Sequence, residues 1–400
     1  MLPPEYLSSC SDQLIELYEE LADEIIADIA RRIVKTGELS ATAEWQTIQL
    51  QELGATQQEI IEKVAAMTNR TEAEIRRLFE EAAMTNMEND ARPLMEAGLD
   101  VDLRLSDAQR QILEATIRRT QGNLKNLTLT TGQTGGDLYL RASNNAYMKV
   151  TSGAFSLQEA CWQSVEMASR EGATVSFTRR RDKLDVAIRR NVVTSVNQTC
   201  ANITESWSKE MGVEYYEVSA HPGARPEHAE WQGKVYKING EEPGYPNFQD
   251  STGYGTAAGL CGVNCRHSFY PFWPGISTPA YDESDRELFS MKVIEYQGES
   301  YTEYEAQQIK RSMERKIRQT KRVLVGADAG REAATDPEVR QKFKDAFDQN
   351  SALLRSQRKA LTDFCEATGR YVESDRIRVH GYTRSIAAKT GAANRRRRQS

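Results

Sequence analysis

Residues 221–236 read HPGARPEHAEWQGKVY and residues 259–267 read GLCGVNCRH, and these two segments lie in the most unusual part of the chain. Residues 221–280 hold 7 of the chain's 11 prolines and 9 of its 25 glycines. Proline fixes φ and removes a backbone donor, and glycine admits positive φ, so long helices are excluded here. Aromatic side chains supply the burial that regular structure does not. We predict a small, loop-rich α+β domain with short strands at 213–218 and 234–238.

Histidine and cysteine are concentrated in the same stretch. It holds three of the four histidines and two of the six cysteines, namely His221, His228, His267, Cys261 and Cys265. Imidazole and thiolate are ligands that zinc prefers, and a loop-rich segment gains folding free energy from a structural metal. The spacing C-x-x-x-C-x-H is not that of a standard zinc finger. The hypothesis of structural zinc therefore stands beside a second one, in which buried thiols and histidines are bonded to loop backbone.

A catalytic interpretation of these residues also exists. His228-Ala-Glu230 reproduces the H-x-E motif of zinc deaminases, in which the glutamate moves a proton while a histidine and two cysteines hold the metal. Cys261 and Cys265 would then supply the remaining ligands of a zinc-dependent deaminase or hydrolase. Two features oppose this hypothesis: the cysteines are spaced C-x-x-x-C with no preceding proline, and Gly233 follows too soon for a helix to begin at H-x-E.

Other catalytic motifs are weaker still. A nucleophilic thiol at Cys265, activated by His267 or His221, lacks an evident third residue to orient the base. The sequence contains neither a Walker A loop nor a G-x-G-x-x-G after a strand, and Gly253-Tyr-Gly255 is too short to cradle a phosphate. The residues therefore favour a protein without an active site, and we expect no enzyme.

The chain on either side of this stretch has the pattern of helices. Near the N-terminus, apolar residues recur every three or four positions at Leu14, Leu17, Leu21, Ile25, Ile29 and Ile33. Capping boxes, with Glu or Gln three residues on, begin at Thr56, Thr71, Ser106, Ser156, Thr302 and Thr335. We predict a mainly α fold with a small α+β, loop-rich central domain and helical N-terminal and C-terminal regions.

Shifts in composition predict five consecutive regions. These are an acidic helical N-terminal domain at 1–120, a linker or insertion rich in Gly and Thr at 121–155, a core at 156–290, a basic helical region at 291–380, and a basic, disordered tail at 381–400. We find no internal repeat.

The net charge of −6 hides a strong polarity between the two ends of the chain. Residues 1–100 carry 8 Lys and Arg against 21 Asp and Glu, whereas residues 301–400 carry 23 against 13. Opposite net charges at the two ends of the chain indicate that each end contacts a different neighbour, or that the two ends of different copies contact each other. Cations suit nucleic acid because each phosphate contact releases a counterion, and the candidates are Arg395, Arg396, Arg397 and Arg398. The alternative is a solvated terminus.

Composition also excludes several protein classes. Hydrophobic residues make up 39% and charged residues 28%, so the chain can fold but has a large polar surface. We find no positively charged leader before an apolar run and no run of eighteen apolar residues, and we therefore expect no membrane partner. Six cysteines in 400 residues do not make a disulfide scaffold. We expect a soluble intracellular protein.

The motif at 221–267 resembles the tailed-phage minor capsid proteins related to the phage Mu F head protein. The matching positions are His221, Arg225, His228, Trp231, Gly233, Asn264, Cys265, Arg266 and His267. The helical segment at 189–197 is similar to the segment that precedes this signature in the family. Residues 31–37 and 43–45, together with 301–306 and 314–317, resemble the subgroup from phages and prophages of Gram-positive bacteria.

This resemblance implies a minor structural protein of the phage head that is present in few copies and associated with the portal. Such a protein acts in head assembly, DNA packaging or DNA delivery, and has no established catalytic activity. The implied partners are portal and capsid proteins, with packaged DNA at the basic C-terminal region. The implied location is the virion head, and the host cytoplasm during assembly.

Overall fold

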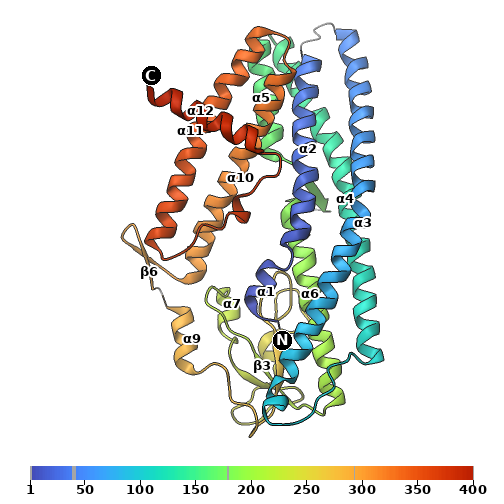
Figure 1. Ribbon diagram of the computed structural model, residues 1–400, viewed down its shortest axis with the longest axis vertical. Helices are drawn as coiled ribbons and strands as arrows, with labels where there is room; N and C mark the ends of the chain where they lie inside the picture. The colour runs from blue at the N-terminus through green and yellow to red at the C-terminus, as the bar shows by residue number, and fades with distance from the viewer. Residues whose placement is uncertain (1, 38–41, 178–179, 292, 400) are drawn as a thin grey trace. The chain divides into compact units, whose positions relative to one another are not determined.

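Figure 1 shows a computed structural model of the chain, which describes residues 2–37, 42–177, 180–291 and 293–399. The described residues are mainly α-helical, with three small antiparallel sheets, so the predicted fold class is confirmed. The chain forms two compact units, each assembled from three segments. Unit 1 comprises Met1–Ile15, Asn69–Lys125 and Ile188–Gln308, and unit 2 comprises Glu16–Thr68, Asn126–Ala187 and Ile309–Ser400.

In the described residues, unit 1 combines two small sheets, one of three strands and one of two, with four short helices and parts of three long ones. Its helices are α1 (Pro4–Ser9), the C-terminal part of α3 (Thr42–Glu96), the N-terminal part of α4 (Asp107–Thr151), most of α6 (Leu184–Glu210), α7 (Pro226–Ala229), α8 (Phe248–Thr252) and α9 (Glu283–Ser290). Its strands are β3 (Tyr215–Val218), β4 (Val235–Lys237), β5 (Phe269–Phe272), β6 (Ile294–Tyr296) and β7 (Glu299–Tyr301). The order β4-β3-β5 pairs Tyr216 with Tyr236 and with Pro271. The two strands predicted before 240 are therefore present as β3 and β4.

The core of unit 1 is built from aromatic rings. The ring centroids of Tyr216 and Phe269 lie 4.6 Å apart, and Phe248 lies 5.0 Å from the first and 4.9 Å from the second. Trp231, Leu260, Cys261 and Cys265 belong to the same buried cluster. A segment with few regular hydrogen bonds thus gains its stability from close-packed aromatic burial, as its composition predicts.

Unit 2 is helical apart from one hairpin. Its helices are α2 (Asp12–Gly37, from Glu16), the N-terminal part of α3, the C-terminal part of α4, α5 (Leu157–Glu171), α10 (Glu303–Ala333, from Ile309), α11 (Pro337–Ala367) and α12 (Arg384–Gln399), with a 3₁₀ turn at Asp375–Ile377. Its strands are β1 (Thr174–Phe177) and β2 (Arg180–Lys183). No helix in the described part of the chain combines the length and apolarity that crossing a bilayer demands.

The helices of unit 2 pack through the residues that their apolar periodicity marks. Ile25, Ile29 and Ile33 of α2 are at most 2% exposed. Trp162 of α5 meets Phe343 of α11 edge to face, with ring centroids 5.6 Å apart. Gly330 of α10 faces the same ring, and a Cβ there would lie 2.3 Å from it, so the close approach of α10 and α11 requires glycine.

Two of the predicted capping boxes are complete, and a third is formed by half. Ser106 and Thr302 each accept from the backbone three residues on, and the side chain at that position returns a bond to the cap backbone. Ser156 makes the first of these bonds, from Glu159 N at 3.3 Å. The prediction for α11 was one residue early, because Asp336 rather than Thr335 caps that helix. Thr56 and Thr71 do not begin helices, since both lie inside α3.

The prediction of a linker at 121–155 is wrong over most of its length, because α4 continues to Thr151. The Thr130 and Thr131 hydroxyls donate to carbonyls four residues back, and Leu138 and Tyr139 are at most 2% exposed. Burial of one helix face outweighs the unfavourable helix propensity of Gly and Thr.

The prediction of a disordered tail at 381–400 is also wrong, since α12 spans Arg384–Gln399. Ile386 and Ala393 are buried, and Lys389 Nζ donates to Asp328 of α10 at 2.6 Å. Asn394 Nδ2 donates to the Ser351 carbonyl of α11 at 3.1 Å. The five consecutive regions predicted from composition differ from the two units, which interleave segments distant in sequence.

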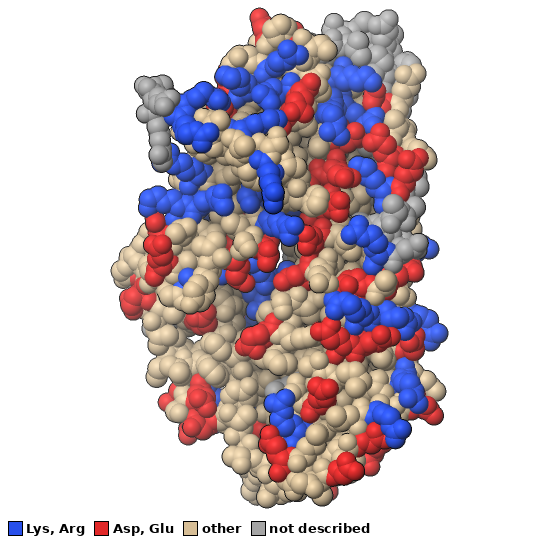
Figure 2. All heavy atoms as spheres, in the orientation of Figure 1, with Lys and Arg blue, Asp and Glu red and all other residues tan. Residues whose placement is uncertain are grey.

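Basic side chains gather over α11 and α12 on the face that Figure 2 shows. Helix α12 carries six Lys and Arg residues and no acidic residue. Exposed members of this basic surface are Arg340, Lys344, Arg355, Arg358, Lys359, Arg384, Arg395, Arg396 and Arg397. Arg396 also forms an ion pair with Asp348 of α11 at 3.2 Å, which partly neutralises its charge. The side chain of Arg398 lies outside the described residues.

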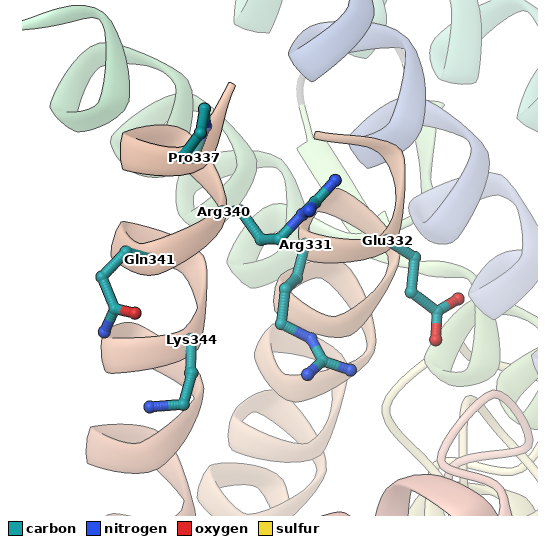
Figure 3. A pocket seen from close by; sticks show the side chains of 6 residues that line it. All are labelled: Arg331, Glu332, Pro337, Arg340, Gln341 and Lys344. Atoms are coloured by element: carbon teal, nitrogen blue, oxygen red, sulfur yellow. The ribbon is translucent and has the colours of Figure 1, made fainter. Parts of the chain in front are cut away.

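A pocket of about 390 Å³ opens where α10 ends and α11 begins, within unit 2. Figure 3 shows its lining residues, which are Arg331, Glu332, Pro337, Arg340, Gln341 and Lys344. Arg331 is paired with Asp328 at 2.9 Å, and Glu332 with Lys389 at 2.9 Å. Three cations against one anion extend the basic surface into this pocket.

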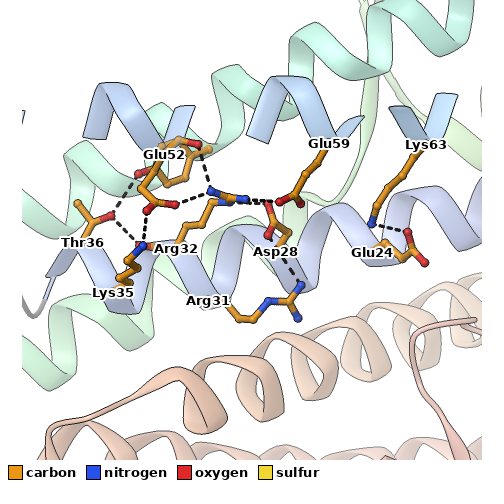
Figure 4. Close-up of polar contacts among 10 residues, drawn as sticks. Glu24, Asp28, Arg31, Arg32, Lys35, Thr36, Glu52, Glu59 and Lys63 are labelled. Carbon is orange, nitrogen blue, oxygen red and sulfur yellow. Dashed lines mark hydrogen bonds and ion pairs between the residues drawn. The ribbon is translucent and has the colours of Figure 1, made fainter. Parts of the chain in front are cut away.

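Helices α2 and α3 are joined in unit 2 by a charged network (Figure 4). Arg32 is its centre: its guanidinium donates to Asp28 at 2.7 Å, to Glu59 at 2.9 Å and to Glu52. Lys35 reinforces the contact to Glu52. Burial opposes ionisation of Glu52, but the neighbouring cations outweigh it and lower its pKa.

A second, more deeply buried charged cluster joins α10 to α2. Arg322 Nε lies 3.3 Å from Asp23, and its guanidinium lies 3.8 Å from Glu19. All three residues are at most 8% exposed. Asp23 also accepts from Gly381 N at 3.0 Å, which fixes the segment that precedes α12. Burial, helped by the nearby Asp185, raises the pKa of Glu19 to about 7.

Candidate metal centre

Residues 261–267 form a loop of unit 1 that α6 holds through side-chain amides. Asn197 Nδ2 donates to the Cys265 carbonyl at 3.1 Å and to the His267 carbonyl at 2.9 Å. Gln198 Nε2 donates to the Cys261 carbonyl at 3.3 Å. Buried carbonyls of an irregular loop need such partners, and these bonds fix the path of the loop.

The loop needs this support because its backbone is unusual. Cys261 and Asn264 have φ of 57° and 55°, a region that side chains other than Asn and Asp rarely adopt. Asn264 N donates to the Thr194 hydroxyl of α6 at 3.1 Å. Arg225 Nη2 donates to the Val263 carbonyl at 2.9 Å, from the residue that precedes α7. The chain is thereby turned so that Cys265 and His267 face α7.

Three potential metal ligands meet at this point, one from α7 and two from the loop. His228 Nδ1 lies 3.4 Å from His267 Nδ1, and Cys265 Sγ lies 3.7 Å from each of these nitrogens. The three residues are 3%, 1% and 1% exposed, in the order His228, Cys265 and His267. Trp231 covers the cluster, with its ring 4.6 Å from that of His228 and 4.8 Å from that of His267.

Hydrogen bonds determine which nitrogen of each ring carries the proton. His228 Nε2 lies 2.9 Å from the Ala258 carbonyl, which can only accept, so this nitrogen is the donor. His267 Nε2 lies 3.0 Å from Gln232 Oε1, and the same oxygen accepts from His221 N at 3.1 Å. That second bond identifies the oxygen of the amide, so His267 Nε2 also donates. Both Nδ1 atoms therefore present lone pairs to the cluster.

The other two predicted ligands lie beside this cluster. The Cys261 thiol is directed at Asn197 Oδ1 and at the His267 carbonyl, both at 3.7 Å, and it does not belong to the group of convergent donors. The His221 ring stacks on that of His267, with centroids 4.4 Å apart. Its Nδ1 lies 3.0 Å from the Pro222 carbonyl, and its buried Nε2 has no hydrogen-bond partner in the described structure.

Burial dominates the electrostatics of the cluster. It lowers the pKa of His267 well below the usual range, and it lowers the pKa of His228 and His221 as well. Without a bound cation, burial raises the pKa of the Cys265 thiol to about 11. A buried, protonated thiol is a poor nucleophile, so the hypothesis of a Cys265 nucleophile activated by His267 or His221 is not supported.

The geometry does not support the hypothesis of a zinc deaminase that uses Glu230. Helix α7 is a single turn, and residues two positions apart on a helix point about 200° apart, so His228 is buried while Glu230 is exposed. The Glu230 carboxylate therefore lies on the opposite side of the turn from the donor group. Cys261, the second thiol that this mechanism needs, does not belong to that group.

Comparison with known proteins identifies the family of this chain. Residues 2–366 match the family described as "Phage minor capsid protein 2". The chain belongs to this family. It is also 23% identical, over 70% of its length and 76% of the relative, to a "Structural protein" of Lactococcus phage LL-H. A "Structural protein" of Lactococcus phage mv4 is 33% identical over 22% of the chain and 60% of that relative. No solved structure matches.

The sequence-based resemblance to phage minor capsid proteins is thus confirmed. Several residues of the predicted signature build the loop and its surroundings in this minor capsid protein. Asn264 tolerates the positive φ, Gly233 adopts φ of 66°, and Arg225 holds the loop backbone. Gln232 and the roles of Asn197 and Gln198 were not predicted from the sequence. The polar positions of α6 that face the loop were the available signal, because polar side chains in a buried helix need buried partners.

Proposed function

We propose that this chain is a minor structural protein of the phage head that contacts the portal and other capsid proteins. In this role it acts in head assembly and in DNA packaging or delivery. The observation that carries the proposal is the family match over residues 2–366, together with relatives named structural proteins of Lactococcus phages. The architecture supports this proposal, because signature residues at 221–267 form hydrogen bonds to the loop backbone or pack against aromatic rings. Such contacts are typical of residues with a structural role.

Portal contact is tested by lysine crosslinking in purified particles of the phage that encodes this chain, followed by mass spectrometry. We compare the number of crosslinks per copy of each partner. We expect this number to be larger for the portal protein than for the major capsid protein. Crosslinks to tail proteins alone would contradict portal association. A nonsense mutation in the gene separates the two roles: empty heads indicate packaging, and DNA-filled, non-infectious particles indicate delivery.

We also propose that α12 contacts packaged DNA. Its six cations are unopposed by acidic residues on the same helix, and the basic surface continues over α11 into the pocket at the α10–α11 turn. Three of the four arginines predicted from the sequence, Arg395, Arg396 and Arg397, are exposed. Phosphate recognition requires no groove-reading element, so a helix that presents charge along its surface is sufficient.

Replacing Arg395–Arg398 by glutamine is expected to weaken binding of the full chain to a random-sequence duplex. Each phosphate contact contributes about 0.9 to the slope of log affinity against log salt, so up to about 3 to 4 of that slope is lost. Fluorescence anisotropy at salt concentrations from about 50 to about 200 mM measures this slope. Glutamine at Arg104 and Arg110, exposed arginines of unit 1, is the control. An unchanged slope in the α12 variant would exclude DNA contact through these arginines.

A further inference from the structure

The spacing of the three convergent donors fits a tetrahedral metal ion. With zinc–nitrogen bonds of about 2.0–2.1 Å and a zinc–sulfur bond of about 2.3 Å, tetrahedral angles place two nitrogens about 3.3 Å apart and sulfur about 3.6 Å from each. The observed distances are 3.4 Å between the Nδ1 atoms of His228 and His267, and 3.7 Å from Cys265 Sγ to each. An ion just off the plane of this triangle would need almost no movement of its ligands.

The positions of the protons show that the cluster is incomplete without a cation. Both imidazoles donate through Nε2, so two nitrogen lone pairs face each other across 3.4 Å. The thiol of Cys265 brings one hydrogen, which can serve only one of these nitrogens. The other Nδ1 then faces a lone pair in a buried site, which is an unfavourable arrangement. A metal ion satisfies all three donors at once when the thiol releases its proton to solvent and binds as the thiolate.

The surroundings supply the outer shell that bound metals require. A metal-ligating histidine usually donates its other ring N–H to a carbonyl or carboxylate, which fixes the tautomer and orientation of the ring. Ala258 O performs this role for His228, and Gln232 Oε1 performs it for His267. Asn197 holds the carbonyls of Cys265 and His267. The loop is thus fixed at both of its ligand positions from α6.

We propose that this cluster binds one zinc ion through Cys265 Sγ and the Nδ1 atoms of His228 and His267. His221, whose ring stacks on that of His267, lies outside the group of convergent donors and is not assigned as a ligand. Imidazole nitrogens and one thiolate favour zinc over the oxygen-seeking cations. The ion ties α7 to the 261–267 loop in a buried position, so its role is to stabilise the fold of unit 1.

Metal analysis of the full-length chain, purified without chelators and then dialysed with ZnCl₂, tests the proposal. We expect one zinc ion per chain in the wild type, and loss of most of it in Cys265→Ser and His228→Ala. Cys261→Ser is the matched control, because this neighbouring buried thiol is not a ligand, and it should retain zinc. Absence of zinc from the wild type, or equal loss in Cys261→Ser and Cys265→Ser, would overturn the assignment.

Two measurements keep the test independent of misfolded variants. Cobalt substituted into the wild-type chain should give the absorption of a tetrahedral site with a thiolate-to-metal charge-transfer band; an octahedral spectrum without that band would overturn the site. Chelation of the wild type should speed hydrogen exchange at 215–272 while leaving α11 of unit 2 unchanged. Exchange that is equal with and without chelator would overturn the stabilising role.

Discussion

Replacing Arg322 by methionine is expected to lower the free energy of unfolding of unit 2 by about 3–5 kcal/mol, the cost of removing one partner from a buried ion pair. Arg322 is 7% exposed, and it is the cation closest to the buried carboxylates of Asp23 and Glu19. Methionine keeps much of the side-chain volume, so the loss comes from uncompensated charge rather than from a cavity. Urea titration followed by hydrogen exchange in α10 reports on this unit.

The loss should depend on pH. Burial already raises the pKa of Glu19 to about 7 from a usual value of 4.5, and removal of Arg322 raises it further. A carboxyl group whose pKa is higher in the folded state than in the unfolded state makes its full contribution to the free energy of unfolding below its unfolded-state pKa. This contribution is lost as the pH rises through the folded-state pKa. The difference between wild type and variant should therefore be larger at pH 8 than near pH 5.

An exposed ion pair provides the control for this prediction. Arg76 of α3 and Glu114 of α4 lie 2.6 Å apart in unit 1 with about half of each side chain exposed, and exposed pairs contribute little to stability. Arg76→Met should therefore have a much smaller effect than Arg322→Met. The double variant Arg322→Met/Asp23→Asn should regain part of the loss, because the amide retains an acceptor for Gly381 N. Equal losses in the two methionine variants would refute the role of Arg322.

Replacing Gly259 by alanine is expected to disrupt the fold of residues 248–267. A Cβ at this position would lie 2.0 Å from the Gly253 carbonyl oxygen and 2.8 Å from that of Thr252. Both obstacles are backbone, and Leu260 N donates to the same Thr252 oxygen at 3.0 Å, so neither can move without breaking the turn. Overpacking usually costs about 1–3 kcal/mol, and we expect a value at or above the upper end.

Gly122 is the matched control, because a Cβ there meets nothing within 4 Å in the middle of α4. Gly122→Ala should raise the free energy of unfolding by up to about 1 kcal/mol, since alanine is the better helix former. Hydrogen exchange at β3 and α8 should increase in Gly259→Ala and stay unchanged in Gly122→Ala. If both variants behave alike, the close backbone approach at Gly259 does not exist.

The sequence allowed the outline of the fold to be predicted, but not all of its elements. Proline, glycine and aromatic residues at 221–280 predict the loop-rich aromatic core, and apolar periodicity predicts α2. The C-terminal part of α4 and helix α12 could not be predicted, because their stability depends on burial of Tyr139 and Ile386 against distant segments. Local propensity is a weak guide where tertiary packing decides.

The residue types of the candidate site could be predicted from the sequence, but which of these residues converge could not. His228, Cys265 and His267 converge as expected from their concentration in one stretch, whereas Cys261 is turned toward Asn197, 64 residues earlier in the chain. That contact depends on the packing of α6, which the loop sequence does not encode. The exposure of Glu230, in contrast, follows from helical geometry once His228 is known to be buried, because the two residues point in nearly opposite directions.

Quantitative mass spectrometry of DNase-treated, density-purified particles of the phage that encodes this chain tests most directly whether the chain is a minor structural protein of the head. A minor structural protein of the head should yield peptides from both units, retained through high-salt washing, at far fewer copies than the major capsid protein. Recovery of the chain from the host lysate together with its absence from purified particles would contradict the account.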